Sequence, residues 1–258
     1  FLTGHASSKL EKEHTRSHLF TNTLIDLSLN NFIKSILQIK YQKVSNDTYL
    51  KLFDLQSPLL LEDNSVLESI IAFDLEHKNY DLRATFEMYE TLNGKNSDRY
   101  QYVLPNYNFS KNFSLDNIKG SFNLNSYGNN TLNATNVVTS SISNDLNYYA
   151  KDKFFNSGIK TNFEISLKNI NTIAKNNPTY KNSPQSELMS AYIYNASLPL
   201  IKKNSKTINT LEPKLSLRFS PHEMKNNTSV SRRIDVSNVF SFNRLSLGNS
   251  FEEGESIT

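Results

Sequence analysis

The chain has 258 residues, no cysteine and no tryptophan, and a formal net charge of +3 from 28 basic and 25 acidic residues. The lack of cysteine excludes a disulfide scaffold, a thiolate metal site and a thiol nucleophile within this chain. Basic and acidic residues alternate along the sequence instead of forming a basic face or tail, so we expect no nucleic-acid partner. No unbroken apolar run is longer than the four residues at 70–73, whereas a membrane helix needs roughly 20.

Apolar and polar residues alternate at period two in successive segments, which predicts β-strands. The first clear segments cover residues 33–42, 67–76 and 80–88, and the polar pair Lys78 and Asn79 between the last two predicts a hairpin turn. The alternation returns at residues 159–168, 192–198 and 211–219. We expect an all-β fold of roughly ten to twelve long strands in an antiparallel up-and-down meander.

The predicted connections differ in length. The turns at residues 30–31 and 78–79 are tight, whereas those at residues 175–186 and 221–236 are long. Alternating tight turns and long loops are typical of outer-membrane barrels. Strands of about ten residues also suit a bilayer crossing better than a soluble sheet. Aromatic residues near the segment ends, such as Phe20, Tyr41 and Tyr80, suit an interfacial girdle.

The polar residues of each segment share one face of the expected sheet. In a transmembrane barrel this face lines a watery lumen while the apolar face meets lipid; in a soluble sandwich the apolar face is buried against a second sheet. The charge on the polar face favours the barrel. The candidate lumen-facing residues are Glu68, Asp74, Glu76, Arg83, Glu87, Lys160, Glu164, Lys214 and Arg218.

The sequence predicts no catalytic, cofactor or metal site. The five histidines are scattered, and neither a Gly-x-Ser-x-Gly elbow nor a glycine-rich phosphate loop occurs. Two alternatives stay open. One is another outer-membrane barrel, either a channel or an enzyme such as a phospholipase, whose serine, histidine and acid would meet across strands. The other is a soluble β-sandwich adhesin, in which the faces at residues 33–39 and 67–73 would pack in a dry core.

Several segments, in the same order along the chain, resemble the barrel domain of the LptD family, the lipopolysaccharide-assembly proteins of Gram-negative outer membranes. Residues 15–20 and 44–54 are similar to a mid-barrel hairpin and its loop in that family, and residues 102–107 to a further strand. Residues 211–221, 235–244 and 251–258 are similar to later strands and loops. The family-motif residues are Asp47, Thr48, Tyr49, Pro105, Leu211, Glu212, Pro213, Phe240, Asn243, Arg244, Glu252 and Gly254.

The resemblance implies that residues 1–258 form one partial domain, the middle of a large barrel whose N-terminal jellyroll and gate strands lie outside this chain. It implies transport of lipopolysaccharide to the outer leaflet, without a cofactor and without enzymatic activity. The implied partners are lipopolysaccharide, an LptE-like plug lipoprotein, outer-membrane lipid and, through the jellyroll, the periplasmic bridge proteins. Because such a segment has two open sheet edges, we expect it to be unstable alone.

Overall fold

The computed structural model describes residues 2–10, 15–55, 57–60, 65–95, 98–224, 234–241, 244–245 and 250–258. Most of these residues lie in strands. The long strands are β1 (Leu2–Leu10), β2 (Thr15–Asp26), β3 (Phe32–Val44), β4 (Val66–His77), β5 (Tyr80–Thr91), β6 (Tyr100–Leu115), β7 (Ile118–Asn133), β8 (Val137–Ala150), β10 (Lys160–Lys175) and β11 (Gln185–Ser197). The shorter elements are α1 (Tyr49–Leu52), β9 (Lys153–Phe154), β12 (Leu200–Lys203), β13 (Ile208–Leu211), β14 (Lys214–Ser220) and β15 (Gly254–Ile257).

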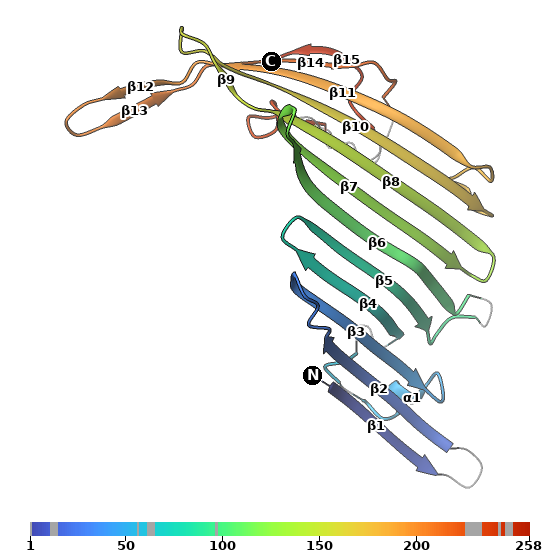
Figure 1. The fold of residues 1–258 in the computed structure, drawn as a ribbon. Helices are drawn as coiled ribbons and strands as arrows, with labels where there is room; N and C mark the ends of the chain where they lie inside the picture. The colour runs from blue at the N-terminus through green and yellow to red at the C-terminus, as the bar shows by residue number, and fades with distance from the viewer. Residues whose placement is uncertain are drawn as a thin grey trace. The chain divides into compact units, whose positions relative to one another are not determined.

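The strands form one large sheet in the order of the chain. This 13-stranded sheet runs β1-β2-β3-β4-β5-β6-β7-β8-β10-β11-β14-β15, with β9 paired to β10, and Figure 1 follows the same order by colour. The order begins at β1 and ends at β15, so the described strands form an open sheet and not a closed one. The pairings from β1 through β6 are antiparallel, as are those of β11 with β14 and of β14 with β15. The prediction of an all-β, up-and-down meander is confirmed.

The chain separates into two compact units. Unit 1 contains residues 1–111, 126–143 and 171–185, and unit 2 contains residues 112–125, 144–170 and 186–258. In unit 1 the tight turns at residues 27–31 and 78–79 join strands at one end, here named the tight-turn end. The connections that follow β3, β5 and β10 begin at the other end. In unit 2 we give the same name, the tight-turn end, to the end where residues 116–117 join β6 to β7 and residues 151–159 join β8 to β10.

A compact cluster of apolar side chains lies in unit 1 beneath the connection at residues 45–60. Tyr49 and Leu50 of α1 are buried there, and the Tyr49 hydroxyl lies 3.0 Å from His18 Nδ1. The cluster consists of Phe20, Val44, Tyr49, Leu50, Leu67 and Leu92. The expectation that Phe20 belongs to an exposed girdle was therefore wrong, because the folded connection covers it. Leu67 is buried in the same cluster. Burying each such side chain stabilises the fold by about 1.5–3 kcal/mol.

Prolines lie where strand pairing is interrupted. Pro105 lies in β6 opposite a register shift between Thr85 and Glu87 of β5. Pro199 separates β11 from β12, and Pro213 separates β13 from β14. Proline lacks the N–H that a ladder bond requires, so these positions match its usual confinement to bulges and strand ends.

The strands on either side of the last two prolines keep one register. Tyr192 pairs with Phe219 in the main sheet, and Leu200 pairs with Leu211 in the separate two-stranded sheet of β12 and β13. The two residue numbers of each pair add up to the same total, so neither arm has an extra residue between the two sheets. Figure 1 shows β12 and β13 leaving the main sheet as a narrow hairpin. All eight residues of these two strands are exposed.

Candidate functional site: the two faces of the sheet

The apolar face of unit 1 is a continuous exposed surface. Leu37 pairs with Phe73, Ile39 pairs with Ile71, and Ile71 pairs with Phe86, so these side chains lie side by side on one face. Ile39 is 37%, Ile71 44% and Phe86 41% exposed. The sandwich alternative requires these residues to be buried between two sheets, and within unit 1 they are not. A large exposed apolar patch marks a protein or membrane contact surface.

Unit 2 has a matching apolar face. Tyr192 pairs with Phe219, Tyr194 pairs with Leu217, and Leu217 pairs with Ile257 of β15. All five side chains are exposed. Together with residues of β10 they border an open cavity of about 440 Å³ whose walls are largely apolar. An apolar groove of this kind suits an alkyl chain.

Each unit carries a ladder of aromatic rings across four strands at its tight-turn end. The rings of each ladder are in contact with centroids 4.6–6.1 Å apart. In unit 1 the ladder is Phe32, His77, Tyr80 and Phe109. In unit 2 it is Phe113, Phe122, Tyr148 and Phe163. Aromatic rings at one level along a sheet are typical of the belt that barrels place at a membrane interface.

The polar face of unit 1 brings five of the predicted residues together. Glu68, Glu87, Asp74, Arg83 and Glu76 share the face because Asp74 pairs with Arg83 in register and the others alternate with the apolar residues. Ion pairs link this face across strands: the Nζ atom of Lys40 lies 2.6 Å from Glu68, and Lys34 binds Asp74. Opposite charges that pair across neighbouring strands stabilise such a face.

In unit 2 the predicted polar residues also share one face. Lys160 binds Asp152 at 2.9 Å, and Asn195 donates a hydrogen bond to Glu164 at 3.1 Å. Lys168, which the prediction missed, is buried and binds Asp145 at 2.7 Å. Lys168 occupies a polar position in the alternating segment at residues 159–168, and this position could have identified it as a residue of the polar face.

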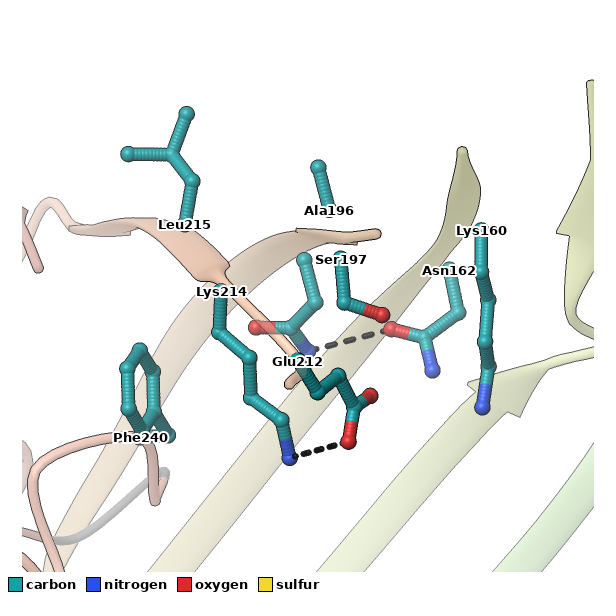
Figure 2. A pocket seen from close by; sticks show the side chains of 9 residues that line it. Lys160, Asn162, Ala196, Ser197, Glu212, Lys214, Leu215 and Phe240 are labelled. Atoms are coloured by element: carbon teal, nitrogen blue, oxygen red, sulfur yellow. Dashed lines mark hydrogen bonds and ion pairs between the residues drawn. The ribbon is translucent and has the colours of Figure 1, made fainter. Parts of the chain in front are cut away.

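Lys214 and Lys160 border a small cavity on this polar face. The cavity has a volume of about 170 Å³, and Phe240 lies at its edge (Figure 2). Lys214 lies 3.5 Å from Glu212. Two family-motif residues, Glu212 and Phe240, therefore meet two candidate lumen residues from distant parts of the chain. The polar, open lining suits water or a sugar hydroxyl.

Arg218 lies on the polar face but is covered by the C-terminal segment. Its side chain is only 3% exposed and donates a hydrogen bond to the backbone oxygen of Glu252. Arg244 binds the Glu252 carboxylate through two nitrogens, at 2.7 and 2.6 Å. This bidentate contact lowers the pKa of the Glu252 carboxyl and raises the pKa of Arg244. Two family-motif residues thus fix the segment that precedes β15.

The motif residues Asp47 and Thr48 have structural roles beside the buried cluster. Arg99 binds both Asp47, at 2.6 Å, and Glu90, at 2.5 Å. The hydrogen bond that Arg99 donates to Asp47 is the main cause that raises the pKa of Arg99. Thr48 donates its backbone N–H to Asn46 at 2.9 Å, which forms the turn before α1. Glu90 is almost fully buried, and sequence reasoning missed it.

The other motif residues are dispersed. Leu211 is exposed at the end of β13, Pro213 precedes β14, and Gly254 begins β15 with φ +79°, a conformation that favours glycine. Asn243 lies outside the described residues. The motif residues therefore do not form one site.

A serine and a histidine approach each other on unit 2. Ser190 Oγ lies 3.4 Å from His222 Nε2, and Ser190 is buried. A hydrolase also needs a carboxylate or amide to orient the other ring nitrogen, and none of the described side chains forms that bond. The described residues also hold no group of three or more histidine, aspartate or glutamate side chains placed for a metal ion. This pair gives little support to the barrel-enzyme alternative.

Within the described parts of the chain, no helix is both long enough and apolar enough to cross a membrane. The chain was also compared with known proteins. Neither the protein-family models nor the curated proteins gave a match.

Proposed function

We propose that this chain forms part of the wall of a transmembrane β-barrel that assembles lipopolysaccharide in the outer membrane of a Gram-negative bacterium. One observation carries the membrane part of the proposal: an exposed apolar face, bounded by an aromatic ladder, lies opposite a face of paired charges. Lipid would cover the apolar face, and water would fill the space beside the charges.

The dimensions of β5 agree with a bilayer crossing. The ten residue steps from Tyr80 to Glu90 cover about 34 Å along an antiparallel strand. With the usual barrel tilt of about 40°, this length spans about 26 Å, close to the apolar band of about 25 Å in outer-membrane barrels. Between Tyr80 and Glu90, the positions on the apolar face are Leu82, Ala84, Phe86 and Met88.

The assignment to lipopolysaccharide transport rests on the ordered motifs that resemble the LptD family. A wall of this type needs no nucleophile or cofactor, because its charged side chains only have to stay hydrated beside a passing sugar chain. The partners proposed with it are lipopolysaccharide, an LptE-like plug lipoprotein inside the barrel, and the periplasmic bridge proteins. A channel without lipopolysaccharide traffic is the second candidate, since the same paired charges would line any aqueous lumen.

Cysteine labelling tests the membrane part. These 258 residues hold no cysteine, so Phe86→Cys and Arg83→Cys each give this part of the protein one thiol, on opposite faces of β5. In the full-length protein in vesicles, we expect a fluorophore at position 86 to be quenched by brominated acyl chains and one at position 83 to be quenched by aqueous iodide. Equal iodide quenching at both positions would overturn the membrane placement.

Photocrosslinking tests the transport part separately. We expect benzoylphenylalanine at Arg83, on the polar face, to capture lipopolysaccharide in cells that are exporting it. The same group at Phe86 serves as the lipid-face control and should capture mainly bilayer lipid. If position 83 captures no lipopolysaccharide while the quenching pattern holds, the chain belongs to another kind of barrel.

A further inference from the structure

A cavity of about 990 Å³ lies at the tight-turn end of unit 2, and lysines and aromatic rings line it together. Lys119 comes from the start of β7, whereas Lys151 and Lys153 come from the connection after β8. The rings belong to Tyr148, Phe155, Phe163 and Tyr194. Two of these rings, Tyr148 and Phe163, are members of the unit 2 aromatic ladder.

Backbone contacts hold the three lysines in place. The Lys119 carbonyl oxygen accepts a hydrogen bond from the Tyr148 hydroxyl at 2.9 Å and another from the Lys151 N–H at 3.1 Å. Lys153 pairs with Thr161 at the start of β10, and its ammonium lies 5.0 Å from the centre of the Phe155 ring. Hydrogen bonds and strand pairing therefore hold the backbone at Lys119, Lys151 and Lys153.

Within the described part of the chain, no ion pair is formed by the three lysines of this cavity. Asp152 is the one carboxylate among the described residues of the lining, and it already binds Lys160 at 2.9 Å and accepts a hydrogen bond from Asn162 at 3.1 Å. The hydrogen bond from Lys160 is the main cause that lowers the pKa of Asp152. Among the described residues, no carboxylate lies within ion-pair distance of Lys119, Lys151 or Lys153. Three lysines thus line a cavity that is wide enough for a charged headgroup.

The position of the cavity indicates what kind of anion fits. One wall of the cavity belongs to the exposed apolar face, where Phe163 and Tyr194 are each 45% exposed. A ligand with a phosphate among the lysines could therefore lay alkyl chains along that face. We propose that this cavity binds the phosphate-bearing headgroup of an anionic bilayer phospholipid, an inference that rests on the membrane placement proposed above but not on lipopolysaccharide transport.

The test measures lipid selectivity at the cavity. Ala150 lines the cavity, so Ala150→Cys in the full-length protein carries a fluorophore there, and vesicles contain either brominated phosphatidylglycerol or brominated phosphatidylcholine. We expect phosphatidylglycerol to bind on the order of tenfold more tightly, because each lysine near a membrane surface attracts anionic lipid. The combined change Lys119→Gln, Lys151→Gln and Lys153→Gln should abolish this preference.

A second triple variant is the matched control. Lys202→Gln, Lys203→Gln and Lys206→Gln removes the same charge from the exposed hairpin of unit 2 and should leave the preference unchanged. Equal binding of both lipids overturns this inference but keeps the membrane placement. Quenching by neither lipid overturns both. Loss of the preference when inorganic phosphate is added at about 10 mM would mean that the cavity binds a free anion and not a lipid.

Discussion

At the scale of single residues, two glycines of β7 are needed because tyrosines cover them. A Cβ atom at Gly120 would lie 2.5 Å from the backbone oxygen of Tyr149, and one at Gly128 would overlap the ring of Tyr107. Aromatic side chains that lie over strand glycines are a known way to fill the missing side chain. The two sites differ because a backbone oxygen cannot move aside, whereas a ring edge can.

We therefore expect Gly120→Ala to lower the free energy of unfolding by about 1–3 kcal/mol, as overpacking does. Gly128→Ala should cost less. Urea unfolding of the full-length protein in lipid vesicles measures both, with the exposed Ser121→Ala as the control. A larger cost at position 128 would contradict this ranking.

Glu90 is the second residue for which the structure predicts a clear effect. Its carboxylate receives bonds from Lys43 at 3.0 Å, Arg99 at 2.7 Å and the Tyr100 hydroxyl at 3.2 Å. We expect Glu90→Ala to destabilise the protein by about 1.5–3 kcal/mol, the usual value for hydrogen bonds to a charged group. Glu76→Ala, at an exposed position, should change the same free energy by less than about 0.5 kcal/mol. If Glu90→Ala and Glu76→Ala lowered the free energy of unfolding by similar amounts, the buried network around Glu90 would contribute nothing to stability.

At the scale of elements, the attachment of the C-terminal segment should depend on pH. Because Arg244 lowers the pKa of Glu252, the ionised carboxylate stabilises the folded segment at every pH above the ordinary glutamate value of about 4.3. This contribution is lost only as the pH falls through the lower, folded-state pKa. Hydrogen exchange of residues 250–258, corrected for the intrinsic rate, should therefore stay slow at pH 5 and rise below about 4.

The variant Glu252→Gln gives the comparison. It cannot form the charged pair with Arg244, so its exchange should be faster at neutral pH and nearly independent of pH. Wild-type protection that is already lost at pH 6 would rule out this carboxylate as the anchor.

At the scale of the whole molecule, the two faces should tolerate charge differently. We expect Phe86→Arg, on the apolar face, to cost about 2–4 kcal/mol in a bilayer, as an arginine at the midplane of a barrel does. Asp81→Arg, exposed on the polar face of the same strand, should stay within about 0.5 kcal/mol. Equal costs in vesicle-based unfolding would mean that lipid does not cover the apolar face.

The sequence allowed the strands, the meander and the two faces to be predicted, because alternation at period two is a local property. The pairings of Ile39 with Ile71 and of Ile71 with Phe86 follow once neighbouring strands are assumed to form hairpins in chain order. Burial of Leu67, Glu90 and Arg218 could not be predicted, because each is covered by a connection whose path depends on contacts far along the chain. The cavity near Lys119 was missed for the same reason, since its lysines come from the start of β7 and from the connection after β8.

The shared register of β11–β14 and β12–β13 sets a rule for how this part of the chain can change length. The two arms, residues 192–203 and 208–219, keep one antiparallel register from the pair Tyr192 and Phe219 to the pair Lys203 and Ile208. One residue inserted into a single arm would turn every side chain beyond it to the opposite face. Homologous chains should therefore differ here by equal insertions in both arms, or by changes confined to the tip at residues 204–207.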